Sequence, residues 1–245
     1  NIESLRLVLQ QRQQDLLAHK SLTFDQFQNN QFYPTKSIVI KGTITPALPF
    51  HINDERIVPN KKGRFTYKYQ MKDRHDIIRI NAFDQTKNYN VFVASFYNDL
   101  KSHWFETMAL KLQYLGFIEP DLNFKPQATV SVADFGILTR SFFEDHVVSD
   151  NLSVNSVESL MLTKAEAVSL IVGQMVVSDI MFDLPYWDVQ KGYWAYEAIS
   201  DAYSLQLITT NTRFYPDRPI TKAELVSMLA KLPHIKKKLM GSFYD

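Results

Sequence analysis

The sequence predicts a mixed, multidomain protein in which a small antiparallel β-sandwich is followed by an α-helical repeat domain. Apolar and polar residues alternate in short segments between residues 37 and 94, as they do in strands. From residue 95 the spacing becomes helical, and a pattern of landmarks occurs twice. The 245 residues include 45% hydrophobic and 22% charged residues, which is typical of a folded chain with one large domain or two small ones.

Charge and motif content exclude several functional classes. The 27 Lys and Arg residues nearly balance 26 Asp and Glu residues, and the net charge of +1 gives no bulk field for nucleic acid or an anionic membrane. The chain has no cysteine, which excludes disulfide scaffolds, thiol catalysis and thiolate zinc sites. Its six histidines lack metal-ligand spacing, and no catalytic-serine, phosphate-loop, dinucleotide or zinc-protease motif occurs. No apolar run approaches the roughly 18 residues of a membrane-spanning helix. We therefore expect a protein that is not an enzyme, that uses no cofactor or metal, and that binds no nucleic acid.

Residues 1–36 are predicted to form an N-terminal helical segment or linker. Leucine and valine recur at helical spacing among glutamine and arginine over residues 5–17, and Pro34 ends the segment. Residues 25–30, rich in Gln and Asn, predict a short helix or a loop. The start at Asn1 shows neither an initiator methionine nor a signal-peptide pattern, so we expect a processed chain or part of a longer one.

Residues 37–94 are predicted to form the sandwich. Strands are expected over residues 37–44, 64–69, 76–83 and 89–94, where β-branched and aromatic residues are enriched. Between the first two, residues 50–53 and 56–58 flank the polar pair Asp54-Glu55, which is typical of a hairpin. Short strands at this spacing, separated by turn residues, are typical of sandwich domains.

Four segments of this zone resemble the bacterial immunoglobulin-like (Ig-like) domains found beside glucodextranase and in many surface proteins. They are Ile40-Lys41-Gly42-Thr43-Ile44, Phe50-His51-Ile52-Asn53, Lys62-Gly63-Arg64-Phe65 and Ile78-Arg79-Ile80-Asn81-Ala82-Phe83-Asp84. The resemblance covers nearly the whole zone and implies an Ig-like fold that acts as a spacer or an adhesive module. Such a fold says little about chemistry.

Residues 95–245 are predicted to be helical and to contain repeats. When Trp104 is aligned on Trp194, further landmarks fall at equal distances along the chain. These are Ile118 with Ile208, Phe124 with Phe214, Pro126 with Pro216, Ser131 with Thr221, Ala133 with Ala223, and Asp134 with Glu224. We assign a worn repeat to residues 95–143, a degenerate repeat to 144–180 and a well-preserved repeat to 181–235.

Each repeat contains a helix start that can form a capping box. In the last repeat, the Thr221 side chain can cap the helix while Glu224 reaches back to the Thr221 backbone N–H. The other repeats have equivalent pairs: Thr163 with Glu166, and Ser131 with Asp134. The pair of Thr163 and Glu166 defines the degenerate repeat. In the pair of Ser131 and Asp134, the shorter aspartate is expected to close the capping box less well than a glutamate would.

The best-preserved repeat resembles a surface-layer homology (SLH) repeat. The resemblance rests on Trp187-Asp188-Val189, Tyr193-Trp194-Ala195, Leu207-Ile208, Phe214-Tyr215-Pro216 and Thr221-Lys222-Ala223-Glu224. It implies an SLH-type domain whose second helices, one from each repeat, form a central bundle. It also implies a non-catalytic protein of the cell envelope, on the bacterial surface or in the periplasm, that anchors to cell-wall polysaccharide or peptidoglycan or takes part in surface-layer assembly.

The resemblance assigns polymer binding to the basic residue after the helix cap and to aromatic residues that line grooves between repeats. The candidate binding residues are Trp194, Lys222, Lys164, Arg218 and Trp104. The chain departs from the family in having lysine where arginine is usual, and valine at position 132 in the first repeat. From the residues themselves we expect Trp104 and Trp194 to pack in the core, Arg218 to be a turn residue, and Lys222 and Lys164 to be solvated.

Two alternatives to envelope anchoring remain open. The protein could be a structural subunit of a larger envelope complex, with the repeats used for contacts with other envelope proteins, or the accessory region of a carbohydrate-active enzyme. The C-terminal residues 241–245 repeat the Ser-Phe-Tyr lead-in of residues 95–99 and predict the start of a further module. We expect the chain to continue past Asp245, or Phe243 and Tyr244 to dock on another subunit or back on this chain.

Overall fold

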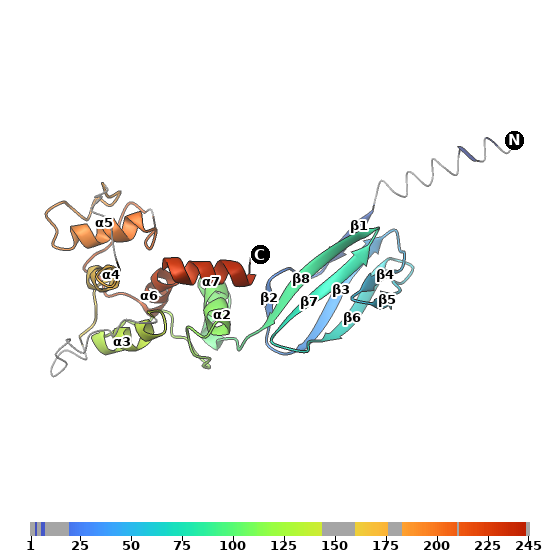
Figure 1. The fold of residues 1–245 in the computed structure, drawn as a ribbon, viewed down its shortest axis with the longest axis horizontal. Coiled ribbons are helices and arrows are strands. Elements are labelled where there is room, and N and C mark those ends of the chain that lie inside the picture. Colours follow the sequence, from blue (N-terminus) through green and yellow to red (C-terminus); the bar gives the residue numbers. More distant parts are fainter. Residues whose placement is uncertain are drawn as a thin grey trace. The chain divides into compact units, whose positions relative to one another are not determined.

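A computed structural model of the chain describes residues 3, 6, 7, 20–143, 160–175, 183–209 and 211–243. They belong to two compact units, residues 1–94 and residues 95–245. The first unit is built from strands and the second from helices (Figure 1), which confirms the predicted mixed, multidomain layout. Most of the helix expected over residues 5–17 lies outside the described residues.

The first unit contains two sheets that enclose one core. The three-stranded sheet has the order β1-β3-β6, and the five-stranded sheet has the order β2-β8-β7-β4-β5. The strands are β1 (Ser21–Phe24), β2 (Gln31–Tyr33), β3 (Ser37–Thr45), β4 (Phe50–Ile52), β5 (Glu55–Ile57), β6 (Arg64–Gln70), β7 (His75–Ala82) and β8 (Gln85–Val93). Alternate residues such as Ile38 and Ile40 on β3 and Ile78 and Ile80 on β7 are buried between the sheets.

Two details of the first unit correct the sequence analysis. Strands β1 and β2 lie within residues 1–36, so the β unit begins before residue 37. β1 joins the core because Phe24 packs edge-on against Phe27 and Phe65, with ring centroids 5.2 and 6.2 Å apart. β2 pairs with β8 in parallel, so the unit is not wholly antiparallel.

The predicted hairpin is present, but its turn is shifted by one residue. β4 and β5 pair through Ile52 and Glu55, which leaves Asn53 and Asp54 as the turn. Asn53 adopts a φ of 53°, a conformation that asparagine tolerates better than most residues. Its side-chain Oδ1 accepts the Arg79 backbone N–H at 2.9 Å, which ties the turn to β7.

The second unit consists of short helices. They are the 3₁₀ helix η1 (Asn98–Leu100) and the α-helices α2 (Glu106–Tyr114), α3 (Val132–Arg140), α4 (Lys164–Val172), α5 (Tyr196–Ser204), α6 (Lys222–Leu229) and α7 (Pro233–Phe243). On α6 and just after it, apolar residues at helical spacing are at most 5% exposed: Leu225, Met228, Leu229 and Leu232. This stripe anchors α6 in the core of the unit.

Backbone hydrogen bonds join the starts of α3, α4 and α6 into a closed ring. The Val130 N–H donates to Ile220 O (3.1 Å), the Ile220 N–H to Leu162 O (2.9 Å), and the Leu162 N–H to Val130 O (2.9 Å). A second set runs in the opposite sense around the ring: Val132 to Leu160, Lys164 to Arg218, and Lys222 to Ala128. Each helix start therefore pairs with both of the others, as in a pseudo-threefold arrangement.

The first and last repeats also share a carboxylate that holds a turn. The Asp99 carboxylate accepts the backbone N–H groups of residues 124 and 125, at 2.8 and 2.6 Å. The Asp188 carboxylate accepts those of residues 214 and 215, at 2.9 and 2.8 Å. Asp99 is therefore the structural counterpart of Asp188.

The C-terminal residues 241–243 form the last turn of α7. Phe243 is 2% exposed, and its ring packs edge-on against Tyr114 of α2 at 5.8 Å. The Lys111 ammonium lies 5.3 Å from the same ring centroid. Phe243 thus docks back on this chain, as one of the alternatives predicted, and residues 241–243 are helical. Tyr244 and Asp245 lie outside the described residues.

Candidate functional site

Capping boxes fix the three helix starts at the ring. In α6 the Thr221 Oγ accepts the Glu224 N–H at 3.3 Å, and a Glu224 carboxylate oxygen accepts the Thr221 N–H at 3.1 Å. The same reciprocal pair occurs at Thr163 and Glu166 of α4. It also occurs at the start of α3, where the aspartate reaches the Ser131 N–H at 3.2 Å. These bonds satisfy backbone groups that a helix start leaves open.

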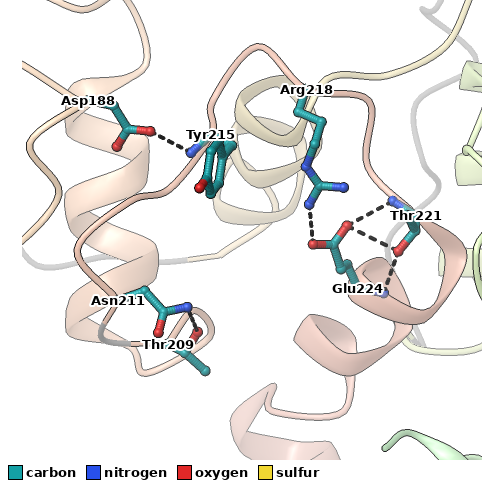
Figure 2. A network of polar contacts seen from close by, with 7 residues as sticks. All are labelled: Asp188, Thr209, Asn211, Tyr215, Arg218, Thr221 and Glu224. Atoms are coloured by element: carbon teal, nitrogen blue, oxygen red, sulfur yellow. Dashed lines mark hydrogen bonds and ion pairs between the residues drawn. The ribbon is translucent and has the colours of Figure 1, made fainter. Parts of the chain in front are cut away.

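Glu224 also forms an ion pair with Arg218, on the turn that precedes α6. Figure 2 shows the two side chains facing each other, with Thr221 at the start of the helix. Burial alone would raise the pKa of Glu224, but the Thr221 backbone N–H, the Arg218 hydrogen bond and the charge of Lys164 together lower it. Glu224 therefore serves as a capping anion and as the counter-ion of two cations.

Lys164 and Lys222 are half-buried, which contradicts the expectation that they are solvated. The Lys164 ammonium lies 4.6 Å from the ring centroid of Phe214, and the Lys222 ammonium lies 4.5 Å from that of Phe124. Hydrogen bonds from Ala165 to Pro216 and from Ala223 to Pro126 bring the starts of α4 and α6 against the Phe-x-Pro turn of another repeat, so each lysine stem crosses a boundary between repeats. Burial lowers the pKa of both ammonium groups.

Trp104 and Trp194 are both 64% exposed, so the expectation that they pack in the core is wrong. The buried position at each helix entry belongs to the next residue: Phe105 is 0% exposed and Ala195 is 2% exposed. An exposed indole in this position offers a flat apolar face with a polar N–H at its edge.

One cavity brings several of the candidate residues together. Its volume is about 260 Å³, and its wall includes Trp104 from the first repeat, Lys164 from α4 and Glu224 from α6. Polar side chains of the last repeat complete it: Thr209, Asn211, Ser227 and Lys231. The Asn211 amide donates to the Thr209 hydroxyl at 3.5 Å (Figure 2). Parts of all three repeats thus meet at one concave surface with an aromatic face and two ammonium groups.

The other candidate residues lie elsewhere. The residues that line this cavity do not include Trp194, Lys222, Arg218 or Glu166. Trp194 neighbours Tyr193, whose hydroxyl donates to Asp217 at 2.6 Å. The pKa of Tyr193 is raised to about 12, first by burial and then by this hydrogen bond.

Sequence reasoning missed two features of the second unit. Lys231 lines the cavity, donates to Leu207 O at 3.1 Å, and has a pKa lowered by burial. Trp187 is 60% exposed, and the guanidinium carbon of Arg213 lies 4.0 Å from its ring centroid. The same guanidinium carbon lies 5.3 Å from the ring centroid of Tyr215. The Arg-x-Tyr spacing of Arg213 and Tyr215 at a turn could have drawn attention to this stack, but only the fold brings Trp187 to Arg213.

Comparison with known families supports the resemblance in part of the chain. The S-layer homology domain family matches residues 185–226, which include the start of α6 and the turn held by Asp188. The family binds cell-wall polymers, so the match indicates an envelope-associated protein. No curated protein matches the chain significantly. The match does not extend to the strand unit, whose Ig-like assignment stays a prediction.

Two searches of the described residues gave negative results. Within the described ranges, no helix is both long and apolar enough to cross a membrane. In the same part of the chain, no cluster of three or more His, Asp or Glu side chains has the proximity needed to hold a metal ion.

Proposed function

We propose that the second unit anchors the protein to the cell envelope by binding an anionic cell-wall polysaccharide or peptidoglycan in the cavity between repeats. The observation that carries the proposal is the convergence of Trp104, Lys164 and Lys231 on one cavity of about 260 Å³. This volume lies below the roughly 300–1,000 Å³ typical of pockets for drug-sized ligands. It would admit one saccharide unit or the end of a chain rather than a long segment.

The chemistry of the wall suits such a ligand. The exposed indole of Trp104 can stack on the apolar face of a sugar ring, while its N–H remains available to a hydroxyl. Lys164 and Lys231 would receive a carboxylate or phosphate group of the polymer. Glu224 does not oppose this, because it is paired with Arg218 and with the backbone of its own capping box. The role requires no catalysis, and we propose that the unit is not an enzyme.

A pull-down with purified cell-wall sacculi tests this function. Trp104→Ala and Lys164→Met should each reduce the bound fraction severalfold, since one removes the stacking face and the other removes the charge but keeps the stem. Lys237→Met is the matched control, because Lys237 is exposed on α7 and outside the cavity. Undetectable binding by the unaltered protein, or equal losses in all three variants, would refute the proposal.

A second candidate function is supported by the stack of Trp187, Arg213 and Tyr215. These three residue types are enriched among the energetic hot spots of protein interfaces. We propose as the alternative that this exposed stack contacts another envelope protein, so that the unit is a subunit of a larger assembly. If Trp187→Ala abolishes retention in envelope fractions while Trp104→Ala leaves it unchanged, the alternative replaces the first proposal.

A further inference from the structure

A second, larger cavity lies at the C-terminal end of α6, whose N-terminal end lies at the ring of hydrogen bonds. Its volume is about 660 Å³, within the range of small-molecule binding sites. Its apolar wall comes from the first turn of α2, the residue after α5 and one side of α7: Met108, Leu205, Leu239 and Met240. The residues that line it include none of the residues proposed to bind polymer except Lys231, which lines both cavities.

The charged residues in the wall of this cavity all carry the same sign. They are Lys111, Lys231 and Lys236, and the described wall contains no carboxylate. Lys111 is only 6% exposed, and a cation at that depth attracts an anion more strongly than one on the surface. Lys236 is exposed on α7, at the cavity's rim. The wall therefore combines an apolar floor with a positive potential.

Two observations favour a small ligand over a protein segment. The lining comes from four segments, namely α2, α7 and the residues that follow α5 and α6, and a volume of about 660 Å³ suits a small ligand rather than the long groove that a docked helix needs. The apolar floor contains two methionines, whose flexible thioether chains adapt to ligands of variable shape. Met240 is 52% exposed, so the apolar floor can be reached from solvent.

We propose that this cavity binds a long-chain fatty acid, with the alkyl chain against Met108, Leu205 and Met240 and the carboxylate among the three lysines. The charge complementarity selects an anionic head group, and the apolar floor selects an unbranched aliphatic chain, since each methylene that leaves water adds to the hydrophobic stabilisation. The two cavities share Lys231, but Lys236 and Met240 line only this one, so variants at these two positions test fatty-acid binding separately from the polymer-binding function proposed above.

Titration calorimetry of the full chain with laurate tests the proposal, with dodecanol and dodecyltrimethylammonium as probes of equal chain length. Laurate should bind most tightly, dodecanol more weakly, and the cation should not bind. Lys236→Glu should weaken laurate binding by about fivefold or more, as expected for reversal of a charge close to the carboxylate. Lys237→Glu, the neighbouring exposed lysine outside the cavity, should change it by less than about twofold.

Met240→Glu should abolish laurate binding while the thermal midpoint of the protein stays near that of the unaltered chain. Three outcomes would overturn the proposal: no heat of binding with laurate, equal affinity for laurate and dodecanol, or equal losses in Lys236→Glu and Lys237→Glu. Light scattering of the same samples tests for a fourth outcome that would overturn the proposal. If Met240→Glu converts a dimer into a monomer, a second copy of the chain covers the cavity and the fatty acid does not.

Discussion

Replacement of Thr221 by alanine should lower the stability of the second unit without changing its fold. The Thr221 hydroxyl caps the Glu224 N–H at 3.3 Å and also donates to the Glu224 carboxylate at 3.0 Å. Loss of a threonine N-cap typically costs about 1 kcal/mol, within a range of about 0.5–2 kcal/mol. Loss of the hydrogen bond from the Thr221 hydroxyl to the Glu224 carboxylate adds little to this cost, because Glu224 keeps its bonds to the Thr221 backbone and to Arg218.

This cost converts into a measurable shift in melting temperature. The second unit has about 150 residues, and 1 kcal/mol shifts the midpoint of a domain of that size by about 2–4 °C. Scanning calorimetry of the full chain should show that shift in the transition of the second unit alone. Thr221→Ser is the matched control, since serine caps as well as threonine and should leave the midpoint within about 1 °C. An unchanged midpoint for the alanine variant, or an equal drop for the serine variant, would show that the capping box does not stabilise the helix start.

Three further predictions concern packing and ionisation. Lys222→Ala should destabilise the second unit by about 1 kcal/mol through lost contact of the stem with Phe124, whereas Lys222→Met should cost less; denaturant titration of both variants compares them. Phe243→Ala should cost about 3 kcal/mol in the same assay, because it empties a buried site beside Tyr114; a cost below 1 kcal/mol would mean that the end of α7 does not pack there. Alkaline unfolding should begin above pH 10, because several tyrosines that ionise near 10 when unfolded have pKa values raised to about 12 in the fold, chiefly by burial. These are Tyr33, Tyr69, Tyr186 and Tyr193. The contribution of these tyrosines to the free energy of unfolding is complete below pH 10 and is lost as the pH rises through 12. Absorbance of tyrosinate during the titration would follow this loss.

The strands of the first unit were largely predictable because each depends on its own alternating pattern. Ile38 and Ile40 show the period of two within β3, and the strand can be inferred without its partners. β2 shows the limit of this approach. It has three residues, and its pairing with β8 depends on a segment about 60 positions away. No local signal distinguishes such a strand from the helical segment or linker predicted for residues 1–36.

The candidate site was predictable only where its features are local. A capping box spans four residues, so Thr163 and Glu166 can be proposed from the sequence. The surroundings of Lys164 cannot, because Phe214 and Trp104 reach it from other repeats. The tryptophans were misjudged because residue type shows apolar character but not the direction of the side chain at a helix entry. Burial of Phe105 directly after Trp104 turns the indole outward.

The ring of hydrogen bonds at the helix starts makes this domain a closed arrangement of repeats rather than a linear array. In a linear array of repeats, units contact only their neighbours, and copies can be gained or lost at an end with a roughly additive effect. Here the segment around Val130 bonds directly to the segments around Leu162 and Ile220, so no repeat is terminal. The number of repeats is consequently fixed. Loss of any one repeat would leave backbone hydrogen-bonding groups unpaired at the helix starts of the other two. In the middle repeat, the hydrogen bonds that close the ring come from residues 160–164.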